Sequence, residues 1–257
     1  MSLGIPSGRA ALQQQRAVLA ELFRFGERSI SDFTDARVCR LYLCGLCPSE
    51  LFPNTKFALP ACTKVHDDTL RQQYESALGK GGPNYEGLLL EQLEGVCERM
   101  ERRALMDARR GEEEDCPGSF IPRVETEHTP EIEAAEKEIA DKERSHEAAV
   151  ACGSILGAQA LEDELAALRR KKCLLQARAC REASVAPPAG RVAHPRLRMC
   201  SGCGVQVNLV DADDRTADHF GGRAHLGHVL AAQTVKRLRE KRGAQGGGAA
   251  PPSGRPF

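Results

Sequence analysis

The chain of 257 residues lacks tryptophan and has few other aromatic residues. Three Tyr and eight Phe bring the aromatic content to 4%, whereas charged residues make up 28%. Little bulky apolar material is therefore present to fill one large core, and small modules joined by helices are favoured. Bound metal can supply stability that such modules lack.

Long apolar runs are also absent. No stretch approaches the ~20 residues of a membrane-spanning helix, and the first fifteen residues contain no uninterrupted apolar segment typical of a signal peptide. We therefore expect a soluble, intracellular protein with no membrane partner. Thiols stay reduced inside cells, so closely spaced members of the eleven cysteines indicate metal binding rather than disulfides.

Sequence motifs of the common enzyme classes are missing. The chain has no Gly-rich phosphate loop, no HExxH or GxSxG sequence, and no His-x-Glu followed by the Pro-Cys-x2-Cys of zinc deaminases. The many carboxylates between residues 86 and 182 belong to charge-rich helical stretches. We predict a protein that is not an enzyme and has no small-molecule substrate.

The clearest motif that is present is Cys200-x2-Cys203-x15-His219-x5-His225. Two close pairs of Cys and His ligands are typical of tetrahedral zinc. The long loop and the wide histidine spacing are similar to single fingers of RNA-associated proteins, such as matrin-type fingers and the C protein of the U1 particle. His228, three residues after His225, is an alternative fourth ligand.

The two histidines lie too far apart for neighbouring turns of one regular helix. The paired glycines Gly221 and Gly222 between them are expected to loosen the backbone, so that both imidazoles reach one metal ion.

A second constellation lies nearer the N-terminus. Cys39, Cys47, Cys62 and His66 form a Cys3His set, with the last two in a helix-compatible pair. Cys44 also makes a Cys-x2-Cys knuckle with Cys47, so the residues alone leave Cys39 and Cys44 open as alternatives. Both constellations offer four protein ligands, which predicts two structural Zn2+ sites rather than catalytic ones.

Helical periodicity fills most of the remaining chain. Apolar spacing predicts a short helix over residues 8–25, a helix containing Leu89, Leu93, Val96 and Met100, and a charged helical tract over residues 131–183 that turns near Gly153 and Gly157. The predicted fold is mainly α, with two small zinc-finger modules joined by a long antiparallel helical hairpin of coiled-coil type. The predicted divisions are an N-terminal helix with the Cys3His finger (1–84), an acidic helical hairpin region (85–183), a Cys2His2 finger with a basic helix (184–242) and a disordered tail (243–257).

Charge is unevenly distributed although 36 basic and 36 acidic residues cancel. Residues 86–182 carry fifteen basic and twenty-three acidic residues, whereas residues 183–257 carry eleven and five. A basic finger end can bind a phosphate backbone through counterion release. With Phe220 as the one aromatic residue near the ligands, contacts to backbone and shallow groove are favoured over base stacking. The candidate RNA-binding residues are Arg198, Arg215, Arg223, Lys236 and Arg237.

The chain resembles the Luc-seven-like family of U1 snRNP-associated splicing factors. The resemblance is carried by FTDARVCRLYLCGLCP with ACTKVHD, by the helical hairpin, and by RMCSGCGV with DDRTADHFGGRAHLGH. It implies a Cys3His finger that uses Cys39 rather than Cys44, and a Cys2His2 finger at Cys200, Cys203, His219 and His225. It also implies nuclear localisation and membership of the U1 particle.

The expected function is recognition and selection of 5′ splice sites in pre-mRNA. The protein would stabilise the duplex between U1 small nuclear RNA and the splice site while contacting U1 snRNP proteins. An alternative is a zinc-stabilised coiled-coil adaptor that binds proteins without direct RNA contact. A DNA-binding regulator ranks third, because one finger with wide histidine spacing supplies little major-groove readout.

Overall fold

The computed structural model describes residues 30–114, 116–117, 119–126 and 129–244. This part of the chain is mainly helical, as predicted. The helix predicted over 8–25 and residues 245–257 of the predicted tail lie outside the described residues, whereas Gly243 and Ala244 belong to a helix. The elements in chain order are α2 (Arg40–Leu43), the 3-10 helix η1 (Pro48–Glu50), α3 (Asp68–Leu78), α4 (Glu86–Glu114), β1 (Ser119–Phe120), β2 (Arg123–Val124), α5 (Pro130–Ala151), α6 (Ile155–Glu182), β3 (Val192–Ala193), β4 (Leu197–Cys200), β5 (Gln206–Asn208), α7 (Asp213–Gly221) and α8 (Arg223–Ala244).

The N-terminal module, residues 30–84, is built from short helices and irregular loops. A small core of four buried side chains holds it together: Val38, Leu43, Leu70 and Tyr74. The start of α3 is capped by Asp67, whose carboxylate accepts a hydrogen bond of 2.7 Å from the backbone N–H of Thr69. The Tyr74 hydroxyl accepts a hydrogen bond of 3.1 Å from the Tyr85 backbone N–H, which ties α3 to the start of α4.

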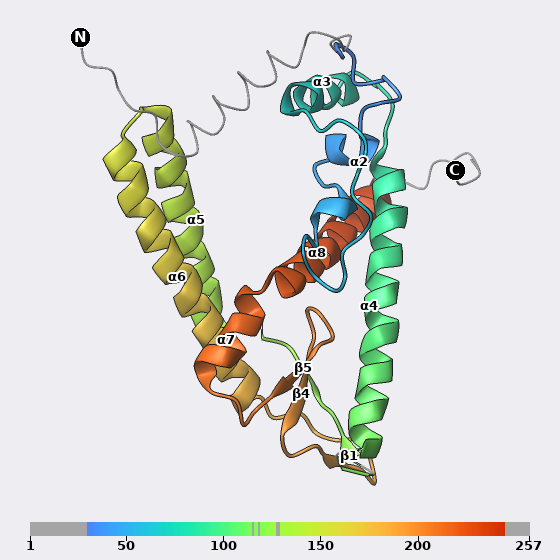
Figure 1. The fold of residues 1–257 in the computed structure, drawn as a ribbon, viewed down its shortest axis with the longest axis vertical. Helices are drawn as coiled ribbons and strands as arrows, with labels where there is room; N and C mark the ends of the chain where they lie inside the picture. The colour runs from blue at the N-terminus through green and yellow to red at the C-terminus, as the bar shows by residue number, and fades with distance from the viewer. Residues whose placement is uncertain (1–29, 115, 118, 127–128, 245–257) are drawn as a thin grey trace.

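The long helix α4 connects the two ends of the molecule. Its predicted apolar stripe is buried at Leu89, Leu93 and Val96. These side chains share one core with a loop of the N-terminal module and with helix α8. The loop contributes Leu51 and Phe52, and α8 contributes Ala231, Val235 and Leu238. Figure 1 shows α8 crossing close to α4 beside this module. The N-terminal module and the second module, residues 184–244, which ends in α8, therefore meet directly, although the chain between them runs through α4, α5 and α6.

Short strands fasten the second module to the segment that follows α4. Strand β2 pairs in parallel with β4, which pairs in antiparallel with β5, and β1 pairs in parallel with β3. Strand β5 lies within the run VQVNLV (residues 205–210), whose alternation of apolar and polar residues is typical of a short strand. The parallel pairs join segments about 75 residues apart, so no local sequence pattern signals them.

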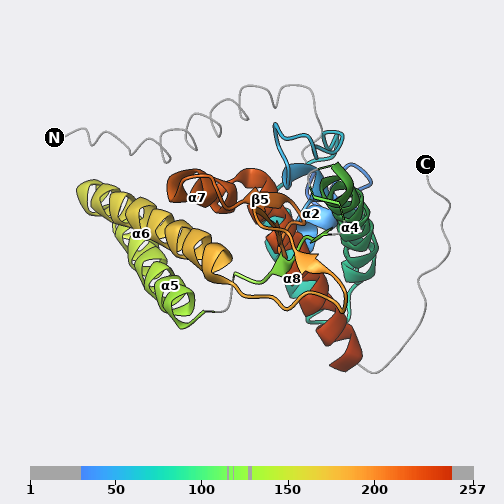
Figure 2. The same cartoon turned by 90° about the horizontal axis from the view of Figure 1, so that it is seen from below.

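Helices α5 and α6 lie side by side in both views (Figures 1 and 2). They are joined by residues 152–154, where Gly153 adopts φ +75°, a backbone region open mainly to glycine. Ion pairs cross between the two helices at Lys142–Glu164, Arg169–Glu143 and Lys172–Glu136. The C-terminal part of α6 packs on the second module, where Ala177 and Cys180 share a core with Cys200, Cys203 and Phe220.

Candidate metal centres and basic surface

The first candidate centre brings together Cys39, Cys47, Cys62 and His66 from four separate positions of the N-terminal module. Their ligand atoms all lie within 4.8 Å of one another. The two sulfur atoms of Cys39 and Cys47 are 3.9 Å apart. Thiolates bound to one tetrahedral zinc ion at about 2.3 Å would be separated by about 3.8 Å, so this geometry fits a metal ion.

His66 is oriented for such a role. Its Nδ1 lies 2.7 Å from Oε1 of Glu50, while its Nε2 is buried without a hydrogen-bond partner among the described residues. The imidazole also stacks on Tyr42, with ring centroids 4.4 Å apart. A carboxylate that fixes one ring nitrogen and leaves the other free is the usual arrangement around metal-bound histidine. Sequence reasoning missed Glu50, and its only signal was a carboxylate three residues after a candidate ligand.

Cys44, the alternative to Cys39, lies elsewhere. Its sulfur atom is 3.6 Å from the hydroxyl of Tyr74 and packs beside the core of the N-terminal module. It does not belong to the group of ligand atoms described above. The geometry therefore favours Cys39, which precedes α2 and is buried.

The second candidate centre brings together Cys200, Cys203, His219 and His225, again with ligand atoms within 4.8 Å. The sulfur of Cys200 is 3.6 Å from Nδ1 of His225, and that of Cys203 is 3.4 Å from Nε2 of His219. A sulfur and a nitrogen bound to one tetrahedral zinc would lie about 3.6 Å apart. This set also fits a metal ion.

The local backbone explains how these four residues meet. The turn after β4 needs Gly204, which has φ +67° and passes so close to α4 that a Cβ would lie 2.5 Å from the Cβ of Ala104. Helix α7 ends at Gly221, and Gly222 is extended before α8 starts at Arg223. The predicted break between the two histidines is therefore present, and it turns both imidazoles toward the same point.

The pKa shifts of the thiols differ between the two centres. Hydrogen bonding from Cys203, assisted by His219 and His225, holds the pKa of Cys200 well below its ordinary value despite burial. In the first centre burial raises the pKa of Cys39 and raises that of Cys47 to about 12. Despite burial, hydrogen bonds from the Lys64 backbone and the His66 ring hold the pKa of Cys62 below its ordinary value. Because metal binding requires thiolates, loading of the first centre must displace protons from buried thiols.

His228, the alternative ligand in the second module, is not part of that centre. Its ring lies between Phe52 and Phe57, with centroid distances of 4.5 and 4.9 Å. Burial lowers its pKa to about 4. The residue is therefore a neutral, buried imidazole within the contact between the two modules.

The five candidate RNA-binding residues occupy three kinds of environment. Arg223, Lys236 and Arg237 are exposed and form no ion pair with another described residue. Arg215 is 79% exposed and lies 3.6 Å from Asp211. Arg198 is half-buried and donates hydrogen bonds to the carbonyl oxygens of His194 and Leu197, so much of its guanidinium stabilises its own strand.

The cations in the second half of α8 are divided between two faces. Arg239 pairs with Glu94 at 2.7 Å, and Lys241 pairs with Glu86, so this face of α8 is neutralised by α4. Lys236 and Arg237 instead point their charge to solvent. The exposed side of α8 is therefore the part of the helix available to an anionic partner.

None of the helices in the described part of the chain is long and apolar enough to cross a membrane.

A family model described as the LUC7 N-terminus matches residues 13–248. The U1 snRNP-associated protein usp106 of Schizosaccharomyces pombe is 30% identical over 236 residues, which cover 88% of this chain and 86% of that protein. The putative RNA-binding protein Alsin2 of Drosophila melanogaster is 29% identical and matches 93% of this chain and 56% of its own length. The human putative RNA-binding protein Luc7-like 1 is 29% identical, with 90% and 62% covered. The chain thus spans less than two thirds of the latter two relatives.

Proposed function

The chain belongs to the LUC7, or Luc-seven-like, family, and we propose that it is an RNA-binding protein of the U1 snRNP that acts in pre-mRNA splicing in the nucleus. The similarity to a U1 snRNP-associated protein over most of both chains carries this proposal. Relatives named as RNA-binding support the same class of partner. None of the three names describes an enzyme, which agrees with a role in binding rather than catalysis.

Both Cys/His centres would hold structural Zn2+. Each offers four soft or borderline ligands, which would fill all four coordination positions of the zinc ion and leave none open for a substrate. In the second centre Cys200, Cys203, His219 and His225 would link the turn after β4 to both α7 and α8. Zinc there would hold the exposed face of α8 at a constant angle to the rest of the module.

That exposed face would contact RNA phosphates. Arg223, Lys236 and Arg237 are exposed cations without ion-pair partners among the described residues, so binding phosphate breaks no existing salt bridge. Each released counterion makes the affinity salt-dependent. Arg215 lies on the same module and would add charge, whereas Arg198 would contribute mainly by holding its strand.

More specifically, the protein would stabilise the duplex between U1 RNA and the 5′ splice site. Backbone contacts are largely independent of sequence, so their binding energy helps most where base pairing is weak. Helices α5 and α6 would act as an antiparallel hairpin arm toward U1 snRNP proteins. The neighbouring exposed side chains of Val150 and Leu156, at 53% and 83%, support a protein contact at its tip.

The direct test measures how tightly the U1 particle binds a mismatched 5′ splice site oligonucleotide with and without the protein. We expect tighter binding with the protein, and the double variant Lys236→Ala/Arg237→Ala should lose about 5- to 30-fold in affinity. The control Arg239→Ala removes a cation of the same helix that faces Glu94, and it should lose less than about threefold. Unchanged particle affinity in the absence of the protein would overturn the mechanism.

The adaptor without RNA contact remains the competing function, and the apolar tip of the hairpin arm is the observation that favours it. Crosslinking in cells followed by RNA sequencing separates the two. Enrichment at exon–intron junctions, reduced by the Lys236→Ala/Arg237→Ala variant, supports direct RNA binding, and absence of enrichment supports the adaptor.

A further inference from the structure

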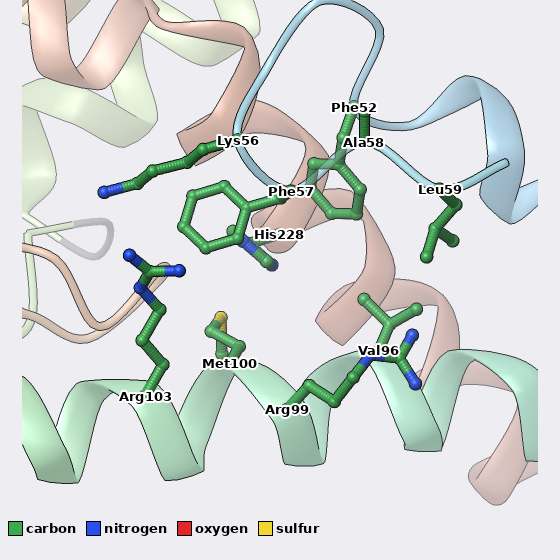
Figure 3. Close-up of a pocket in the computed structure, with 10 residues that line it drawn as sticks. All are labelled: Phe52, Lys56, Phe57, Ala58, Leu59, Val96, Arg99, Met100, Arg103 and His228. Atoms are coloured by element: carbon green, nitrogen blue, oxygen red, sulfur yellow. The ribbon is translucent and has the colours of Figure 1, made fainter.

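A cavity of about 370 Å3 lies between the two modules and is separate from both metal centres. Its walls come from the loop around Phe52 and Phe57, from α4 and from His228 of α8. Figure 3 shows Arg99, Met100 and Arg103 extending from α4 toward this loop. A volume of this size is at the small end of ligand-binding pockets, so it suits one compact ligand rather than a polymer segment.

One wall combines an aromatic ring with two cations. The ring of Phe57 is half-buried, and both Nζ of Lys56 and Cζ of Arg103 lie 5.3 Å from its centroid. Arg99 adds a third cation, which has no ion-pair partner in the described part of the chain. Among the described residues no carboxylate lines the cavity, although Asp107 approaches Arg103 at 3.7 Å on α4. The cavity is therefore electropositive and has a flat apolar surface.

The floor contains an unusual polar group. His228 is 3% exposed, and neither of its ring nitrogens makes a hydrogen bond with any described residue. Burial without a partner is unfavourable for such atoms, by about 1–3 kcal/mol each. Burial also keeps the imidazole neutral by lowering its pKa to about 4, which leaves it one donor and one acceptor nitrogen. Both nitrogens have less than 1 Å2 of accessible surface, so a ligand reaches them only when the neighbouring side chains move aside.

We propose that this cavity binds a single unpaired nucleotide of RNA. The base would stack on the Phe57 ring and displace the Arg103 guanidinium, now 5.3 Å from the ring centroid, onto the other face of the base, because the present separation is too small to hold a base. Its polar edge would face His228, and its phosphate would lie near Lys56 and Arg99. Stacking of a base on an aromatic ring or an arginine plane is a general mode of RNA recognition. The assignment rests on the proposed RNA-binding function and extends it to a nucleotide outside the duplex.

Two observations favour a nucleotide over an acidic peptide. A flat base can stack on the Phe57 ring while its phosphate meets the surrounding cations, whereas a peptide carboxylate would gain only the charge attraction. The cavity also lies one helical turn along α8 from His225, so a nucleotide bound there would be within reach of RNA held by the second module. A peptide would ordinarily need an extended groove or a free strand edge.

The test uses the full chain and its NMR signals. The protein is titrated with UMP, CMP, AMP and GMP, and separately with ribose 5-phosphate, inorganic phosphate and an eight-residue Asp/Glu peptide, while the ring protons of His228 are followed. We expect at least one mononucleotide to shift His228 and to bind at least tenfold more tightly than ribose 5-phosphate. Equal binding of ribose 5-phosphate, or binding of the peptide alone, would overturn the proposal.

Variants locate the contacts. Phe57→Leu keeps an apolar side chain but removes the stacking surface, and it should weaken mononucleotide binding by about 5- to 150-fold. Arg103→Ala should weaken it at least fivefold, whereas the control Arg102→Ala, on the neighbouring exposed position of α4, should leave it within twofold. His228→Phe preserves the ring and should alter the order of preference among the four nucleotides. Equal effects of Arg102→Ala and Arg103→Ala would refute the assigned site.

The test of the cavity and the test of the duplex mechanism can fail separately. If no mononucleotide binds while the protein still tightens the U1 particle on a mismatched site, the cavity assignment is wrong and the proposed function stands. If mononucleotides bind but particle affinity does not depend on the protein, the cavity assignment stands and the duplex mechanism is wrong.

Discussion

Gly227 is the most sensitive point of the contact between the two modules. It lies in α8 where the helix crosses the loop of the N-terminal module. A Cβ at this position would lie 2.7 Å from the carbonyl oxygen of Leu51 and 2.7 Å from Cε1 of Phe52. Phe52 is 1% exposed and packs against the rings of Phe57 and His228, and the oxygen belongs to the backbone. Gly227→Ala must therefore push α8 away from the loop.

The magnitude follows from two opposed effects. Alanine in place of glycine within a helix raises the free energy of unfolding by about 0.5–1 kcal/mol. Overpacking of a close contact lowers it by about 1–3 kcal/mol, and the upper half applies here because a backbone atom must move. The expected net loss is about 1–2 kcal/mol, which for a chain of this size lowers Tm by about 2–8 °C.

Urea and thermal unfolding measure this difference, with the metal content of each protein determined in parallel. Gly95→Ala is the matched control, because Gly95 lies in the middle of α4 and its Cβ would meet only Nη1 of Arg99, at an ordinary 3.6 Å. The control should raise Tm by about 1–4 °C. A Gly227→Ala protein as stable as the unaltered chain would refute the close packing of α8 on the loop.

Three further outcomes are expected. Native mass spectrometry should detect two zinc ions per chain. Cys62→Ser or Cys203→Ser should each remove one zinc ion, whereas Cys44→Ser should remove none. Loss of zinc in Cys44→Ser would contradict the ligand sets. Because the pKa of His228 is about 4 in the folded protein and about 6.5 when unfolded, the unfolded chain takes up the extra proton between these values, so stability falls as the pH drops from 6.5 to 4. His228→Phe should remove on the order of 3 kcal/mol of that loss, as measured by urea unfolding at each pH. If both proteins lost the same free energy of unfolding between pH 6.5 and 4, the neutral buried state would be disproved. Leu93→Ala, in the core shared by α4 and α8, should lower the free energy of unfolding by about 2–5 kcal/mol in the same assay, and a loss below about 1 kcal/mol would argue against that core.

Local patterns in the sequence predicted much of the candidate metal centres. Ligand spacing identified both sets with one alternative left open in each, Cys44 for Cys39 and His228 for His225, and the structure brings the ligand atoms of each set within 4.8 Å of one another. The glycine pair Gly221–Gly222 predicted the break between α7 and α8. Apolar periodicity predicted the helical stretch of α4 through Leu89, Leu93 and Val96. These features succeed because ligand chemistry, glycine conformation and helical spacing act over a few residues and are written directly in the order of side chains.

The roles of His228 and Cys44 depend on contacts with residues that are distant in sequence. His228 follows two candidate histidine ligands and has the chemistry to serve as one, but packing against Phe52 and Phe57 turns it away from the metal centre. Similarly, Cys44 lies beside Tyr74 rather than with Cys47. Spacing alone cannot distinguish these cases, because each residue has the right chemistry and only a tertiary neighbour determines where its side chain points.

The sequence by itself determined that the chain is helical, poor in core-forming aromatics, and equipped with two Cys/His sets and a basic end. Only the tertiary structure decided that α8 packs on α4 and on the loop at Phe52, that Arg239 and Lys241 are neutralised while Lys236 and Arg237 stay exposed, and that a cationic aromatic cavity forms between the modules. The physical reason is that segments more than 100 residues apart create this contact. Burial and ion pairing there depend on which surfaces meet, and that information is absent from any local stretch of the chain.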